Sequence, residues 1–142
     1  MSCGESLSEE EPKKAQDLMQ GYDVLAEADS KFADACDKWE WLSDMTRRRN
    51  CQKADVYAQN GAAVIVTAKN SRELVIGAVA SIPKERNKGA ASKLVRAVCA
   101  KAQKDGLCPV TVAADESVSR FYERLGFEAV GRLVLLTRKE NL

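Results

Sequence analysis

A short turn, Arg86-Asn-Lys-Gly-Ala-Ala91, carries the residues whose types and spacing most clearly favour chemistry. It follows an apolar run over residues 74–82 and opens the helical run Ala90-Ala-Ser-Lys-Leu-Val-Arg-Ala. Backbone N–H groups at a helix start have no partner inside the helix, and the helix dipole adds partial positive charge there. A strand, a small-residue turn and a helix start therefore indicate a site suited to a phosphate. Because many such turns carry a glycine for packing, this signal alone is weak.

The chain contains no histidine, and this absence narrows the chemistry more than any other count. It excludes a Ser-His-Asp triad, a Cys-His pair and any metal site that uses histidine. No run of carboxylates has the spacing of a calcium or magnesium loop, so we expect no metal. Acid–base work must fall to Tyr, Glu, Asp, Lys, Cys or water. In a second segment, Phe121-Tyr-Glu-Arg-Leu-Gly-Phe127, Tyr122 is either such an acid or a core tyrosine beside Phe121 and Phe127.

At 142 residues the chain fits one domain, with a helical part over residues 1–50 and a core over 51–142. The longest apolar runs are too short to span a bilayer, and the N-terminus lacks the pattern of a signal peptide. Five widely spaced cysteines indicate a reducing, cytoplasmic location and free, mostly buried thiols. Cys99 and Cys108 have no obvious base beside them, so we expect both to pack in the core.

The charge is unevenly distributed along the chain. Residues 1–45 hold 12 acidic and 4 basic residues, a balance of −8, whereas residues 46–142 hold 18 basic and 9 acidic residues, a balance of +9. A basic C-terminal portion favours a polyanion, either nucleic acid or a phosphorylated cofactor, although the acidic helices could simply lie against it. Nucleic acid is disfavoured, because the Arg47-Arg-Arg49 cluster lies beside acidic residues and lacks interleaved aromatics.

The apolar periodicity predicts the elements that position these residues. A spacing of threes and fours predicts helix from Pro12 to about Arg48, divided in two at Gly21 or at Asp29-Ser30. Residues 55–59, 62–67 and 73–82 are predicted as strands of an antiparallel meander, with turn signals at Asn60-Gly61 and Asn70-Ser71. The remaining elements are predicted as a helix over 88–104, a strand over 109–114, a helix over 116–125 closed by Gly126, and a strand or hairpin over 127–137 bent at Gly131.

This order of elements, with the two motifs in these places, resembles the GNAT superfamily of acyl-CoA-dependent N-acetyltransferases and looks closest to its FR47-like branch. Arg86, Gly89 and Ala91 match the family pattern of Arg or Gln, two residues, Gly, one residue, and Gly or Ala. Tyr122 and its neighbours match the end of a second family segment. The resemblance implies an α/β fold, a mixed and mostly antiparallel sheet flanked by helices, in which the strands over 74–82 and 109–114 run parallel and diverge. We find no strand before the N-terminal helices, where the family has its first.

The resemblance also implies the cosubstrate and the residue roles. Acetyl-CoA would bind with its pyrophosphate at Arg86, Asn87, Lys88, Gly89, Ala90, Ala91 and Ser92. Ser81 and Ile82 would hold the pantetheine through backbone hydrogen bonds, and Asp115 would accept a hydrogen bond near it. Tyr122 matches the position that protonates the leaving thiolate in many members, after an amine attacks the acetyl carbon directly. For the base, Glu73, Glu85, Glu116 and a water relay all stay open.

Three functions stay open on these grounds. The first is an N-acetyltransferase acting on a primary amine of a small molecule or peptide. The second is a non-catalytic acyl-CoA-binding or regulatory domain of the same fold, and the third is the disfavoured nucleic-acid module. A homodimer is also open, because an exposed end strand leaves backbone groups available for pairing.

Overall fold

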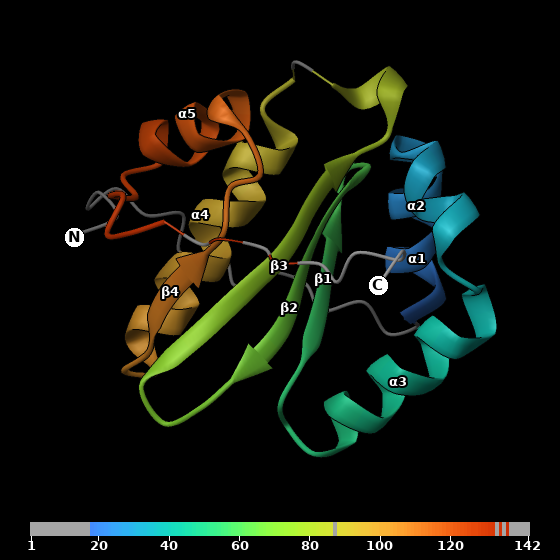
Figure 1. Ribbon diagram of the computed structural model, residues 1–142, viewed down its shortest axis with the longest axis horizontal. Coiled ribbons are helices and arrows are strands. Elements are labelled where there is room, and N and C mark those ends of the chain that lie inside the picture. Colours follow the sequence, from blue (N-terminus) through green and yellow to red (C-terminus); the bar gives the residue numbers. More distant parts are fainter. Residues whose placement is uncertain (1–17, 87, 133, 135, 137–142) are drawn as a thin grey trace.

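A computed structural model describes residues 18–86, 88–132, 134 and 136, and a four-stranded sheet forms its centre (Figure 1). The strands are β1 (Asp55–Gln59), β2 (Ala62–Lys69), β3 (Glu73–Ser81) and β4 (Cys108–Thr111), and they neighbour one another in that order. β1, β2 and β3 form an antiparallel meander, whereas β4 runs parallel to β3. The predicted fold class, a mixed and mostly antiparallel sheet with flanking helices, is confirmed. Within the described residues, no strand precedes the helices.

Two asparagine turns set the register of the meander, as the sequence predicts. At the first turn, Asn60 and Gly61 have φ values of 53° and 77°, the left-handed pair that a two-residue hairpin requires. At the second, the side-chain oxygen of Asn70 accepts hydrogen bonds from the backbone N–H groups of Arg72 and Glu73, both 2.7 Å long. These local bonds make each chain reversal possible without help from the rest of the fold.

Helices cover both faces of the sheet (Figure 1). On one face lie α1 (Leu18–Ala28), α2 (Ser30–Ala35) and α3 (Lys38–Asn50). The other face carries α4 (Ala90–Lys104), with α5 (Glu116–Arg124) beside it, and a short 3-10 helix, η1 (Pro83–Glu85), connects β3 to the turn before α4. Because both faces are covered, β1 and β2 are buried almost continuously rather than at every second residue.

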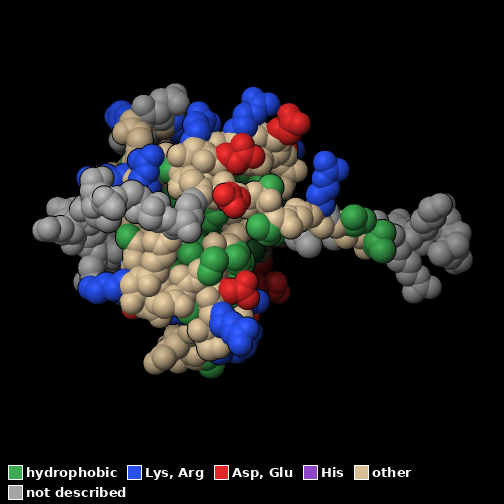
Figure 2. Space-filling model, turned by 90° about the vertical axis from the view of Figure 1, so that its left-hand side faces the viewer, with side chains coloured by type: hydrophobic (Ala, Val, Ile, Leu, Met, Phe, Trp, Pro, Cys, Tyr) green, Lys and Arg blue, Asp and Glu red, His purple; other side chains and the backbone are tan. Residues whose placement is uncertain are grey.

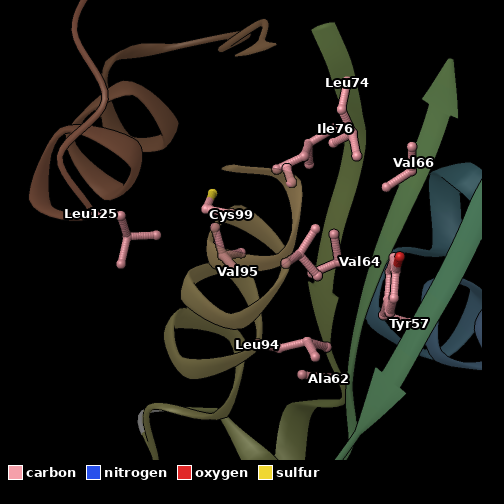
Figure 3. Close-up of a cluster of buried hydrophobic side chains, with 12 residues drawn as sticks. Tyr57, Ala62, Val64, Val66, Leu74, Ile76, Leu94, Val95, Cys99 and Leu125 are labelled. Atoms are coloured by element: carbon pink, nitrogen blue, oxygen red, sulfur yellow. The ribbon is translucent and has the colours of Figure 1, made fainter. Parts of the chain in front are cut away.

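The side chains of each strand alternate between the faces, and this alternation divides the core into two clusters. Val64 and Val66 point toward α4, whereas Ile65 points toward α1. The α4 cluster also contains Tyr57, Leu74, Ile76, Leu94, Val95, Val98 and Cys99 (Figure 3). The α1 cluster also contains Leu18, Leu25, Met45 and Val56.

The division of the N-terminal helices differs from the prediction, because the structure has three helices in place of two. Gly21 does not interrupt α1; it is buried, and a Cβ atom added there would overlap Cγ1 of Val56, so the glycine lets α1 approach β1 closely. The break at Asp29-Ser30, the other predicted position, is confirmed, because Asp29 caps α2 by accepting a 2.9 Å hydrogen bond from the N–H of Lys31. The sequence does not predict the second break, at Asp37, which precedes α3. The part of the predicted helix before Leu18 lies outside the described residues.

The strand or hairpin predicted over 127–137 is also wrong where the structure describes it. Residues 127–132, 134 and 136 form no strand, and Val130 and Leu136 are 97% and 87% exposed. The apolar alternation in this stretch indicates a strand, but a strand forms only beside a partner strand, and the described residues of this stretch pair with none. Residues 133, 135 and 137 lie outside the described residues.

Candidate functional site

The most distinctive feature near the predicted site is the point where β3 and β4 separate. The two strands pair in parallel from Glu73 opposite Cys108 to Ile76 opposite Thr111, and the parallel pairing predicted for them is thereby confirmed. β4 ends at Thr111, whereas β3 continues to Ser81. Beyond Ile76, β3 therefore has a strand on its β2 side only within the described residues. The result is a notch at one end of the sheet.

A bulge at Gly77 lies at the apex of this notch. The pairing of β3 with β2 is irregular here, because Ile76 pairs with Val66 while Ala78 pairs with Ile65. Ile76 and Val79, three residues apart, both contact the α4 cluster, so the side-chain alternation shifts by one residue across Gly77. A Cβ atom added at Gly77 would overlap Cγ2 of Thr67 and lie 2.7 Å from its Oγ1, so only glycine fits without a shift.

The register with β2 decides which backbone groups of β3 face the notch. The N–H of Ile82 donates to the carbonyl of Gly61, at 2.9 Å, so the backbone groups of Ile82 point toward β2. Since this direction alternates along an antiparallel pair, the backbone groups of Val79 and Ser81 point toward the notch. Of the two residues predicted here, Ser81 therefore faces the site and Ile82 turns away. Val79, which the sequence prediction does not include, faces the notch in the same way.

The predicted phosphate turn ends at Gly89, which caps α4 in the left-handed conformation with φ of 78°. A Cβ atom added there would meet nothing within 4 Å, so glycine is needed for its φ value and the space around it is open. The first helical bond runs from the N–H of Lys93 to the carbonyl of Gly89, at 3.0 Å. The N–H groups of Ala90, Ala91 and Ser92 therefore have no partner within the helix, and their role as a phosphate cradle stays a prediction.

Among the other residues of the turn, Arg86 makes contacts that the sequence does not predict. The N–H of Arg86 donates to the carbonyl of Pro83, at 3.3 Å, and its side chain donates to two backbone carbonyls rather than into the cradle. Lys88 is exposed beside the helix start, and Asn87 lies outside the described residues. On the face shown in Figure 2, lysine and arginine side chains lie mainly toward the edges, and hydrophobic side chains lie near the centre together with several acidic ones.

Tyr122 is held in place by the residues that follow it. The helix α5 ends at Arg124, and Gly126 shortly after it has φ of 94°. The N–H of Phe127 donates to the carbonyl of Tyr122 at 3.0 Å, and that of Gly126 donates to the carbonyl of Glu123 at 2.9 Å. This pair of bonds is the Schellman motif, and the predicted C-cap glycine is confirmed. The rings of Tyr122 and Phe127 are 5.3 Å apart, which is the hydrophobic contact that accompanies the motif.

The hydroxyl of Tyr122 is directed to the end of the β3–β4 pairing. It forms a hydrogen bond with the side chain of Thr111, whose Oγ1 donates to the carbonyl of Ile76 at 2.9 Å. Burial raises the pKa of the Tyr122 phenol above its ordinary value, and the bond to Thr111 opposes this change. The phenol is thus a buried, protonated acid at the apex of the notch.

Asp115 serves as the N-cap of α5. Its Oδ1 accepts hydrogen bonds from the N–H of Val118, at 3.0 Å, and from the hydroxyl of Ser117, at 2.7 Å. The Val118 N–H, followed by the Ser117 hydroxyl, lowers the pKa of the Asp115 carboxyl. The side chain is exposed, so these bonds leave room for a further donor, and its role toward a cosubstrate stays a prediction.

The candidate bases and nucleophiles of the sequence are dispersed. Glu73 begins β3 at the end away from the notch, and Glu116 is exposed and pairs with Arg120 at 3.2 Å. Cys99 is buried in α4, as predicted, but Cys108 is exposed, because it begins β4 at its open end. Cys51 is exposed as well, so the prediction of mostly buried thiols is wrong for the described cysteines. Among the described residues, no group of acidic and cysteine side chains could hold a metal ion.

The comparison with protein families gives the class. Residues 11–135 match the acetyltransferase (GNAT) domain, which covers well over half of the chain, and the chain therefore belongs to the GNAT acetyltransferase family. No curated protein sequence matches it. No helix among the described residues is long and apolar enough to cross a bilayer.

Solved structures share the fold at low sequence identity. The aminoglycoside 6'-N-acetyltransferase AAC(6')-Ig of Acinetobacter haemolyticus is 18% identical, with a TM-score of 0.67 over 92% of this chain and 98% of that one. A transcriptional regulator of Bacillus halodurans is also 18% identical, with a TM-score of 0.68 over 89% of this chain and 97% of that one. The aminoglycoside N-acetyltransferase AAC(6')-Iy, solved with CoA, is 14% identical, with a TM-score of 0.63 over 94% of this chain and 99% of that one.

Proposed function

We propose that the protein is an N-acetyltransferase that moves an acetyl group from acetyl-CoA to a primary amine. The observation that carries this proposal is the separation of β3 and β4 beyond Ile76 and Thr111, next to a helix start with open space at Gly89, in a chain of the GNAT family. The family supplies the reaction class, and the arrangement supplies a place for each end of the cosubstrate.

The residues present fit acetyl-CoA at three places. The N–H groups of Ala90, Ala91 and Ser92 would bind the pyrophosphate, and the ammonium group of Lys88 would add charge. The backbone groups of Val79 and Ser81 would bind the pantetheine amides as an added strand does, with one N–H left for the thioester carbonyl. When bound, acetyl-CoA supplies an activated acyl group, which a neutral amine can attack without a covalent enzyme intermediate.

Tyr122 would act as the acid in this reaction. As the amine nitrogen bonds to the acetyl carbon, the carbon–sulfur bond breaks and the sulfur receives the phenolic proton. Solvent then returns a proton to the phenol, and water takes the proton that the amine loses.

The acceptor is proposed to be a small molecule or a peptide with a primary amine, and aminoglycosides are the first to test because two similar structures are aminoglycoside acetyltransferases. Three further points stay predictions: the placement in the FR47-like branch, the single domain over residues 1–142 and the cytoplasmic location. A homodimer stays open.

A non-catalytic acyl-CoA-binding role is the second candidate. It is favoured by the placement of two candidate bases, because Glu73 begins β3 at the end away from the notch and Glu116 pairs with Arg120. A similar structure that carries the description of a transcriptional regulator has the same fold.

Two measurements decide between these candidates. Calorimetry with acetyl-CoA tests binding, and no binding at millimolar ligand would reject both. Thiol release in a screen of amines that includes neamine, spermidine and lysine-containing peptides then tests transfer. Acetyl-CoA binding without thiol release above the rate with no amine would leave the regulatory role.

A further inference from the structure

The side chain of Arg86 makes two contacts with backbone carbonyls, and neither contact is part of a phosphate-binding site. Its Nε donates to the carbonyl oxygen of Ser81 at 3.3 Å, and its Nη2 donates to the carbonyl oxygen of Ala28 at 2.9 Å. Ser81 is the last residue of β3, and Ala28, 58 positions before Arg86, is the last residue of α1. One guanidinium group therefore joins the strand at the notch to the helices on the opposite face of the sheet.

The contact with Ala28 is chemically well matched. The last carbonyls of a helix have no partner inside it, and the C-terminal end of a helix carries partial negative charge. A guanidinium group is a permanently charged donor with several N–H groups in a fixed plane, so it can bond two carbonyls at once. Asp29 follows Ala28 directly and caps α2, so the position of α2 depends on where α1 ends.

The contact between Arg86 and Ala28 links elements on opposite faces of the sheet. The phosphate cradle begins α4, on one face of the sheet, whereas α1 and α2 lie on the other face (Figure 1). A thioester in the notch would have its phosphate end on the α4 side, which leaves the α1–α2 side for the amine that attacks it. The residues that hold the α1–α2 junction therefore help to shape the acceptor surface.

We propose that Arg86 is a positioning residue, which fixes the α1–α2 junction against the end of β3 and so shapes the acceptor surface, rather than a ligand of the pyrophosphate. This inference rests on the proposed function. It assigns the two basic residues of the turn different roles: Lys88 contributes to cosubstrate affinity, and Arg86 to the order of the helices that face the acceptor.

The test compares Arg86→Met, Arg86→Lys and Lys88→Gln with the wild type, and uses Arg47→Met as the matched control. Arg47 is an exposed arginine of α3 whose partner Asp44 keeps its bond to Arg48. CoA affinity is measured by calorimetry, and hydrogen exchange of the amides over residues 26–33 is measured by mass spectrometry, with and without CoA. Circular dichroism checks that each variant is folded.

For Arg86→Met we expect exchange over 26–33 to rise about tenfold, as expected when a charged hydrogen bond is lost, while CoA affinity changes by less than about threefold. Arg86→Lys, which keeps one bond, should restore part of the protection even if the methionine variant folds poorly. Lys88→Gln should weaken CoA binding without a change over 26–33, and Arg47→Met should change neither. In the wild type, added CoA should not increase exchange over 26–33.

Two results would overturn the proposal. One is a loss of CoA affinity of about tenfold or more in Arg86→Met, the loss expected on removing a charged phosphate contact, whether or not exchange changes. The other is an increase in wild-type exchange over 26–33 on adding CoA, because a phosphate ligand would then have left Ala28. Absence of CoA binding by the wild type would instead reject the proposed function, and the exchange data without CoA would still show whether Arg86 holds the junction.

Discussion

Tyr122 owes its position to the six residues from Tyr122 to Phe127. A left-handed Gly126 turns the chain, and the ring of Phe127 then packs at 5.3 Å from that of Tyr122. The motif therefore has a structural explanation of its own, whatever the reaction. The motif alone does not specify where the phenolic hydroxyl lies. The interaction with Thr111 places it where β3 and β4 separate.

Tyr122→Phe tests the acid directly, because it removes the hydroxyl and keeps the packed ring. We expect turnover to fall by about 10² to 10⁴, the range for loss of a general acid, while the Kd for CoA stays within about twofold. Steady-state kinetics and calorimetry measure the two effects. Equal turnover in wild type and variant would reject Tyr122 as the acid.

The raised pKa of Tyr122 predicts the pH dependence of stability. The folded state keeps the phenol protonated, so the stabilisation is complete below about pH 10, the ordinary value for tyrosine, and is lost as the pH rises through the raised value. We therefore expect the alkaline loss of stability to be smaller in Tyr122→Phe than in the wild type. Urea unfolding between pH 8 and pH 11 measures this difference, and parallel curves would contradict the burial of the phenol.

Gly89 and Gly106 form a matched pair for a second residue-scale prediction. Both have φ of 78°, and neither has an atom within 4 Å of an added Cβ, so alanine at either position suffers only from the left-handed backbone. Each change should cost about 1–2 kcal/mol of unfolding free energy. Only Gly89 lies in the cradle, so only Gly89→Ala should also weaken CoA binding. Calorimetry measures the affinities, and equal CoA affinities in the two variants would show that the turn at Gly89 does not bind the phosphates.

At the scale of elements, the bulge at Gly77 is the feature that gives β3 its two different edges. Gly77→Ala places a methyl group against Thr67, and we expect overpacking of this kind to cost about 1–3 kcal/mol. Thr67→Ala removes the obstructing atoms, so the double variant should recover much of this loss. A double-mutant cycle by urea unfolding measures the coupling, and additive losses would show that Thr67 is not the obstacle.

The elements show why some predictions hold and others fail. The turn at Asn60-Gly61, the cap at Gly126 and the amphipathic helix before Asp105 are specified by neighbouring residues, so the sequence alone predicts them. Gly21 suggests a helix break that does not occur, because the glycine is required by a residue distant in the sequence. The helix needs a small residue where it crosses Val56. The strand predicted over 127–137 fails for a related reason, since its pattern is local but its partner must come from elsewhere.

The candidate site divides in the same way. The free N–H groups after Gly89 follow from the turn and helix start, which the sequence shows. The direction of the Val79 and Ser81 backbone depends on the register with β2, and the contact of Arg86 with Ala28 spans 58 positions. Local patterns cannot supply either of these facts.

At the scale of the whole molecule, the separation of acidic and basic halves predicts how salt acts on binding. Raising NaCl from about 0.05 M to about 0.5 M should weaken CoA binding about tenfold, because the Debye length falls from roughly 14 Å to roughly 4 Å. Pantetheine, which lacks the phosphates, should bind weakly and with little salt dependence. Calorimetry at several salt concentrations measures both ligands, and equal salt dependence would show that the phosphates are not held by charge.

The one-sided end of β3 has a consequence for the life of the protein before it meets its cosubstrate. A strand with unpaired N–H and C=O groups is a template for pairing with other chains, and native proteins usually shield such edges. Arg86 already donates to the carbonyl of Ser81, and under the proposed function acetyl-CoA would shield the N–H of Ser81 and the backbone groups of Val79. We therefore expect CoA to control self-association. Concentrated protein without CoA should form aggregates on mild heating. Saturating CoA should suppress this aggregation by more than the rise in Tm on CoA binding would explain.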